Sequence, residues 1–171
     1  MGYVHDTQMA QYFAPGVGHY ATGTWTDVAG AVTGTIVKKK TATAETSIVT
    51  LPVALMANSV AYKGCYLKSV EVYWEVLVAA LTTVTAAINK ITLPLGNAAA
   101  PALEALTFTY DALHDAAAER ITLDQHAMTL TITTPEWMSN LSVIYVQMTM
   151  VAPATSTIEF LGYRGNFDIR L

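Results

Sequence analysis

The stretch of the chain that looks most like a site of chemistry is YDALHDAAAERITLDQH, which spans residues 110–126. It holds three aspartates, one glutamate, one arginine and two histidines. Histidine and carboxylate groups together bind several divalent metal ions. If the fold brings His114, Asp115 and His126 together, these three residues are the candidates for a metal site.

The same stretch also fits an ordinary surface helix. If Asp111 caps a helix that runs to Arg120, the polar side chains share one face, and Leu113 and the alanines occupy the other. An acidic start and a basic end also suit the helix dipole. We therefore interpret this stretch as a solvated helix and loop.

Known motifs give no support to an enzyme. The sequence lacks H-E-x-x-H, C-x-x-C, the D-x-D-x-D-G calcium loop and the histidine and glutamate pattern of metal cupins. It also lacks the G-x-S-x-G serine elbow and the glycine-rich phosphate loops. Cys65 is the single cysteine, so no disulfide within the chain is possible. We predict no catalytic residue, no cofactor and no bound metal.

The composition points to a protein that hides much of its surface. Hydrophobic residues make up 53% of the 171 residues and charged residues only 13%, against roughly 25% charged in typical domains. The mean hydropathy is +0.36. Such a chain must enter a membrane, bury its surface against other subunits, or coat itself with neutral polar residues such as threonine.

Two classes of partner are excluded at this point. The longest apolar run, residues 76–88, is interrupted by threonines and is shorter than the roughly 20 residues of a membrane-spanning helix. The start, MGYVHDTQMAQYF, lacks the basic and apolar regions of a signal peptide, so we expect no export. A net charge of −4 argues against nucleic acid. We interpret the lysine triplet at 38–40 as an exposed turn.

Alternation of apolar and polar residues predicts strands from residue 31 onward. The segment 65–79 is the clearest, with an expected buried face of even-numbered positions from Tyr66 to Val78. The segment 141–151 is apolar on both faces, as in a central strand. At least seven such runs predict an all-β fold, an antiparallel β-sandwich of the jelly-roll type. Two alanine-rich segments, 96–106 and 111–120, are the candidates for one or two short helices.

The first thirty residues show no sustained period and contain five glycines and several aromatic side chains. We therefore divide the chain into an extended N-terminal arm, residues 1–30, and a β-sandwich domain, residues 31–171. The arm is expected to lie on its own sandwich or on a neighbouring subunit. Its aromatic side chains are the candidates for interface residues: Tyr12, Phe13, Tyr20 and Trp25.

In overall style the chain resembles the small β-sandwich virion proteins of tailed bacteriophages, such as capsid decoration and head or tail accessory proteins. The segments that carry the resemblance are YFAPGVGHYATGTW, CYLKSVEVYWEVLVAALTTVTAAI and HAMTLTITTPEW. It implies a non-enzymatic structural role in the virion, after synthesis in the host cytoplasm. It also implies a homo-oligomer, with a trimer favoured, that binds a capsid or another virion protein.

Three other functions stay open beside capsid decoration. A shell-forming or filament-forming subunit is possible, although a shell around single-stranded nucleic acid would usually carry a basic arm, and this arm has none. A carbohydrate-binding sandwich would use exposed aromatics such as Trp25 or Trp137. A metal-dependent jelly-roll enzyme would need His114, Asp115 and His126 to converge.

Overall fold

The structure, a computed structural model, describes residues 6–31, 33–54, 64–93, 101–139 and 141–170. Strands dominate this part of the chain. In sequence order the elements are β1 (Asp6–Phe13), η1 (Pro15–Val17, a 3-10 helix), β2 (His19–Thr22), β3 (Trp25–Ala29), β4 (Ile36–Lys40), β5 (Glu45–Val53), β6 (Gly64–Leu77), β7 (Thr83–Thr92), β8 (Ala102–Leu106), β9 (Phe108–Tyr110), η2 (Glu119–Ile121, a 3-10 helix), β10 (Gln125–Met138), β11 (Ser142–Ala152) and β12 (Thr157–Arg170).

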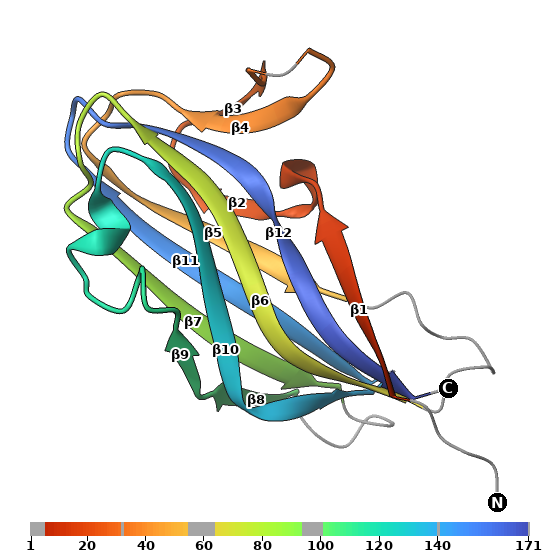
Figure 1. Ribbon diagram of the computed structural model, residues 1–171. Coiled ribbons are helices and arrows are strands. Elements are labelled where there is room, and N and C mark those ends of the chain that lie inside the picture. Colours follow the sequence, from red (N-terminus) through yellow and green to blue (C-terminus); the bar gives the residue numbers. More distant parts are fainter. Residues whose placement is uncertain (1–5, 32, 55–63, 94–100, 140, 171) are drawn as a thin grey trace, which may run out of the picture.

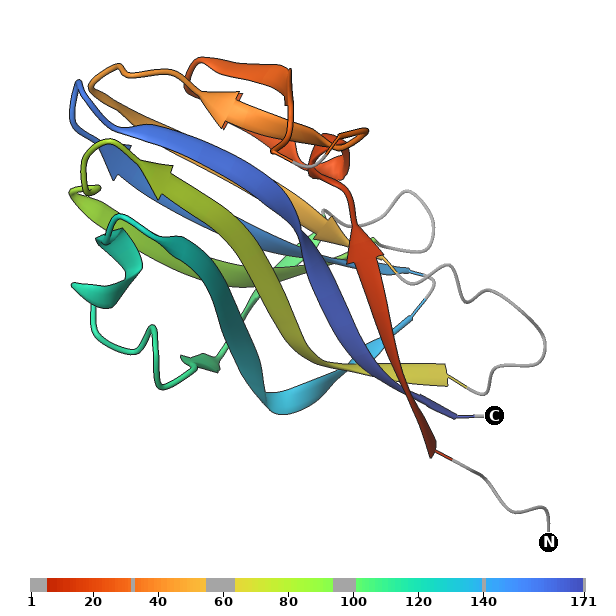
Figure 2. The same cartoon turned by 45° about the horizontal axis from the view of Figure 1, so that its top comes forward.

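The strands form two antiparallel sheets that pack face to face (Figure 1, Figure 2). In sheet A the order is β3-β4-β12-β6-β10-β9, and β1 also pairs with β12. In sheet B the order is β2-β5-β11-β7-β8. The prediction of an all-β, antiparallel β-sandwich is therefore confirmed.

The core lies between the two sheets and draws on alternate residues of each strand. In β11 the buried residues are Ser142, Ile144, Val146, Met148, Met150 and Ala152. Sheet A contributes larger side chains, among which Trp74 and Phe160 are fully buried and Phe167 is 1% exposed. Burial of an aromatic or aliphatic side chain of this kind stabilises the fold by about 1.5–3 kcal/mol.

The predicted buried face of β6 is wrong at its beginning. Cys65 and Leu67 lie in the core, whereas Tyr66 and Lys68 are only partly buried. Pairing with β12 skips Lys68, so one extra residue is inserted in β6 at this point. A β-bulge of this kind reverses which residues face the core. From Val70 to Val76 the even-numbered positions are buried as predicted. Val78, the last predicted position, follows the end of the strand and is 75% exposed, so the prediction is wrong there as well.

Neither predicted helix forms an α-helix in the described residues. The stretch 111–120 forms turns and enters the 3-10 helix η2 at its end. The Asp111 carboxylate accepts hydrogen bonds from the backbone N–H groups of Leu113 and Thr129, which ties the loop to β10 instead of starting a helix. Of the other candidate, residues 96–100 lie outside the described residues, and β8 pairs with β7 because sheet contacts override alanine propensity.

The described part of the chain has no helix long and apolar enough to cross a membrane. Within the region expected to be an arm, β1, β2 and β3 pair with β12, β5 and β4 respectively. Of the two surfaces considered for the arm, its described residues thus lie on the sandwich of their own chain.

The lysine triplet 38–40 is not an exposed turn, because it belongs to β4. The side chain of Lys40 is fully buried. Its ammonium group donates hydrogen bonds to the carbonyl oxygens of Thr41 and Thr43 at 3.0 and 2.7 Å, and it lies 3.3 Å from a carboxylate oxygen of Glu45. The triplet therefore lies within sheet A, and the charge of Lys40 is not exposed on the surface.

Candidate functional site

The loop between β9 and β10 brings two histidines together at one end of the core. His114 comes from the loop and His126 from the start of β10, and they are 6% and 5% exposed. Nε2 of His114 lies 3.3 Å from Nδ1 of His126. His126 sits opposite Trp74 of β6, and the two rings stack with centroids 4.7 Å apart. The cross-strand pair therefore holds His126 in place, and the loop brings His114 to it.

The two imidazoles form the middle of a hydrogen-bonded line between two acceptors. Nδ1 of His114 lies 2.9 Å from the Asp111 carboxylate, and Nε2 of His126 lies 3.0 Å from the Thr122 carbonyl oxygen. Three contacts in a row need three protons, whereas two neutral imidazoles carry two. Two neutral imidazoles therefore satisfy the two outer contacts, in which Asp111 and the Thr122 carbonyl oxygen are the acceptors.

The pKa of His126 and the pKa of Asp111, at the two ends of this line, are both lowered in the fold. Burial lowers the pKa of His126 below its usual value, and the charge of His114 lowers it further, against the effect of the Thr122 carbonyl. Although burial raises it, the pKa of Asp111 is lowered overall by the hydrogen bonds from Thr129 and His114. The fold therefore favours an ionised Asp111 and resists a proton on His126.

Arg120 fastens the loop to sheet B. Its side chain is 7% exposed, and its Nε–H donates to the carbonyl oxygen of Val84 in β7 at 3.1 Å. One terminal nitrogen donates to the carbonyl oxygens of His114 and Asp115. The guanidinium lies 4.2 Å from the ring centroid of Tyr110, which adds a cation–π contact. A buried arginine thus replaces the solvated helix end that the sequence suggested.

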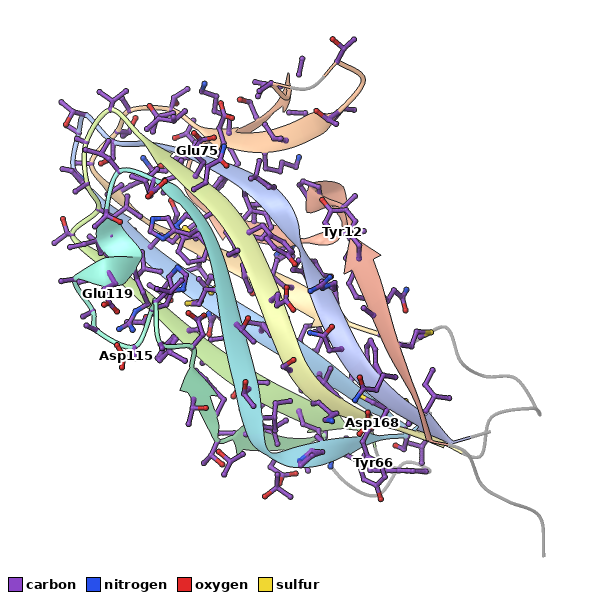
Figure 3. The ribbon with its side chains drawn as sticks, viewed as in Figure 1. Tyr12, Tyr66, Glu75, Asp115, Glu119 and Asp168 are labelled. Atoms are coloured by element: carbon purple, nitrogen blue, oxygen red, sulfur yellow. The ribbon has the colours of Figure 1, made fainter. Side chains whose placement is uncertain are left out.

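The geometry makes this cluster a structural clamp and offers little to a metal. Of the three metal candidates, His114 and His126 meet, but Asp115 is exposed on the outside of the loop (Figure 3). Among the described residues, no group of three or more His, Cys, Asp or Glu side chains could hold a metal ion. All four ring nitrogens already face a partner in the line. The third member of the cluster is Asp111, which the helical interpretation places on the same face as His114 but not among the three metal candidates.

We expect the stability of the protein to fall as the pH drops below about 6.5, the ordinary pKa of histidine. Because the pKa of His126 is lowered in the fold, the unfolded chain binds this proton more readily, and the stability from neutral His126 is lost on acidification. Thermal unfolding at pH 7.5 and 5.5 measures the loss. His126→Gln should reduce the difference between the two pH values, whereas the control Leu113→Ala, which removes no titratable group from the same loop, should not.

A result in which His126→Gln keeps the full pH dependence would contradict this account of the pair. The contribution of Asp111 appears at lower pH. Its lowered pKa gives stability that is present above 3.8 and is lost only as the pH falls through the folded value.

The four predicted interface residues are mostly packed against the sandwich of their own chain. Phe13 is 8% exposed and stacks on Tyr163 with centroids 4.7 Å apart. Tyr20 and Trp25 are half-buried and contact each other at 5.0 Å. Tyr12 is 57% exposed on the outer side of sheet A (Figure 3). Their contact with a neighbouring subunit stays a prediction.

The outer face of sheet A carries paired charges. Arg164 lies 2.6 Å from Glu71, which also accepts a hydrogen bond from Tyr73, and Lys68 lies 3.2 Å from Asp168. Burial raises the pKa of Glu71, but its hydrogen bonds to Arg164 and Tyr73 lower it overall. Figure 3 shows charged side chains toward both ends of this sheet. Sheet A therefore presents an ordinary, solvated surface.

The outer face of sheet B is different, because its strands present no Lys, Arg, Asp or Glu there among the described residues. The register places these side chains on it: His19, Ile48, Thr50, Pro52, Thr85, Ala87, Asn89, Ile91, Leu103, Ala105, Val143, Tyr145, Gln147, Thr149 and Val151. Charged residues of the same strands alternate to the other side, where Lys90 lies 2.6 Å from Glu136 of sheet A. We call this surface the uncharged face.

No known family model matches the chain. No curated protein sequence matches it either.

Proposed function

We propose that this chain is a non-enzymatic structural protein of a virus particle. It assembles as a homo-oligomer, with a trimer favoured, and it binds or stabilises a capsid or a related lattice. In this role it is made in the host cytoplasm and resides in the virion. The resemblance to small virion proteins of tailed bacteriophages supports the proposal. The observation on which it mainly rests is the order of the strands in the two sheets.

The order of the eight central strands supports a jelly roll. From β4 onward the chain moves between the sheets so that sheet A reads β4-β12-β6-β10 and sheet B reads β5-β11-β7-β8. Each sheet thereby combines early and late strands of the chain, as two interleaved Greek keys do. Jelly rolls of this kind occur in viral capsid proteins, lectins and cupins.

The surface and the histidine cluster favour the capsid class among these three. A cupin needs several metal ligands around an open site, whereas His114 and His126 are buried and face protein partners. Among the described residues, one whole sheet face carries no Lys, Arg, Asp or Glu, which suits a subunit that covers this face on assembly. Decoration is preferred to formation of a shell around single-stranded nucleic acid, because the chain has a net charge of −4 and no basic arm.

Proteomic analysis of purified particles tests the proposed function. In a virus that encodes this sequence, we expect peptides of the chain at many copies per particle, in proportion to the major capsid protein. Its absence from purified particles, with abundant chain in the host cell, would contradict the proposal.

Carbohydrate binding is the second candidate, and one observation favours it. Trp137 is 39% exposed and contacts Tyr66 edge to face with centroids 5.0 Å apart. An exposed aromatic pair can stack on a sugar ring. Trp25 is less suited, because its indole N–H donates to the Thr22 carbonyl and its ring packs on Tyr20. Glycan binding that is lost in Trp137→Ala, with assembly intact, would support this alternative.

A further inference from the structure

We propose that the uncharged face of sheet B is a self-association surface, covered in the assembled protein by the same face of a second copy. This inference rests on the proposed structural function and names the partner of one surface. A face-to-face contact of identical surfaces has two-fold symmetry. If the favoured trimer also forms, through another surface of the chain, the oligomer contains six copies.

The absence of charge is the first argument. Taking a charged side chain out of water costs several kcal/mol unless it is well paired. The uncharged face has no such group, and threonine, aliphatic and amide side chains cover it instead. The centres of protein interfaces are likewise depleted in Lys, Glu and Asp. This face can therefore be buried without an electrostatic penalty, whereas the outer face of sheet A cannot.

The choice of a second copy follows from symmetry. In a two-fold contact each charge near the axis meets a like charge of the partner, which is unfavourable. A face without charges avoids this repulsion in a chain whose net charge is −4. A strongly charged partner, in contrast, would find no complementary group here. The same chain is thus the partner that fits the chemistry of the face best.

The size and shape of the face also suit a dimer. Laid flat at about 3.4 Å per residue and about 4.8 Å between strands, the five strands of sheet B cover about 600 Å². Side-chain relief adds to this, and a standard interface buries about 800 Å² per partner. The pairing of β11 with β5 and β7 runs without a register shift, so the central part is regular.

A shallow hollow on the face offers room for a partner side chain. Its volume is about 260 Å³, and its lining includes Ile91, Leu103, Tyr145 and Gln147. Leu103 is 70% exposed at the edge of the face. Close packing of such a surface requires a partner that brings apolar atoms, which a second copy does.

Gln147 near the middle of β11 is the position at which the inference is tested. Gln147→Glu changes the charge with almost no change in shape, and Gln147→Lys introduces the opposite charge. The two-fold axis of the proposed contact lies at this position, in the middle of the face, so that Gln147 meets Gln147 of the second copy. Each variant should then weaken self-association of the full chain at least about 100-fold, as measured by sedimentation, because like charges meet in a buried contact. Gln8, exposed on sheet A, provides matched controls: Gln8→Glu and Gln8→Lys should associate as the parent does.

An equimolar mixture of the Glu and Lys variants at Gln147 should recover the association, because opposite charges then meet across the contact. If each variant dissociates but the mixture does not recover, the face contacts a different surface and the two-fold arrangement is wrong. If the parent assembles and the Gln147 variants assemble equally well, the inference fails and the proposed function stands. A parent that is monomeric at all concentrations overturns both.

Discussion

Arg120→Ala should lower the free energy of unfolding by about 4 kcal/mol and release the loop between β9 and β10 from sheet B. The substitution removes the donor for three carbonyl oxygens, those of Val84, His114 and Asp115. A buried acceptor left without a donor costs about 1–3 kcal/mol. The contact with the Tyr110 ring is lost as well.

Urea unfolding measures the loss for Arg120→Ala, and amide hydrogen exchange locates it. Exchange should rise across residues 111–124 and stay low in the centre of β11. Leu113→Ala is the matched control in the same loop, because Leu113 is 78% exposed and its truncation should change stability by less than about 0.5 kcal/mol. Arg120→Lys keeps the charge but not the planar fork, so its loss should be intermediate. Equal stability of Arg120→Ala and Leu113→Ala would contradict the claim that Arg120 holds this loop on sheet B.

Gly162→Ala should cost about 3 kcal/mol or more and loosen β1 from β12. The pairing of β12 with β6 skips Leu161, and the next residue, Gly162, has a φ of 124°. A Cβ atom at this position would lie 2.6 Å from the carbonyl oxygen of Phe13 and 2.5 Å from the hydroxyl of Tyr12. Both the backbone conformation and the close approach of β1 therefore require glycine.

Gly34→Ala separates these two causes. Gly34 also has a positive φ, 87°, but no atom lies within 4 Å of the position of its added Cβ. Its replacement should cost only about 1 kcal/mol, the cost of the backbone conformation. Urea unfolding of both variants gives the difference, and limited proteolysis shows whether β1 becomes accessible. Equal losses for the two variants would mean that the contact with β1 contributes little.

The sandwich could be predicted from the sequence because its strands follow simple alternation. β10 and the later part of β6 show the expected period of two, and their burial agrees with it. The bulge at Lys68 could not be predicted, because it is set by the pairing of β6 with β12 rather than by local residue types. The burial of Lys40 could not be predicted either. The carbonyl oxygens of Thr41 and Thr43 that accept its hydrogen bonds reach its ammonium group only in the folded chain.

Only part of the histidine cluster could be predicted from the sequence. His114 and His126 were singled out, but the helical interpretation selected Asp115 as their partner, whereas Asp111 fills this place. The spacing of Asp111 to His114 is compatible with a turn in which the aspartate carboxylate accepts a backbone N–H, and this signal could have been used. No pattern in the sequence predicts that Arg120 is buried.

The position of the uncharged face could not be predicted, because it depends on which strands become neighbours in sheet B. The interpretation of residues 141–151 as apolar on both faces is wrong, because Ile144, Val146 and Met148 alternate with the more polar Tyr145, Gln147 and Thr149. The first set is buried in the core and the second set points outward.

Native mass spectrometry of the purified full chain tests the central claim, assembly without chemistry, most directly. One spectrum reports both the number of subunits and any bound metal. We predict a stable, metal-free oligomer of six copies, because the trimer and the two-fold contact of the uncharged faces combine; three copies would keep assembly but contradict the two-fold contact. A monomer that carries one stoichiometric metal ion would contradict the account, and the cluster around His114 and His126 would then be a site rather than a clamp.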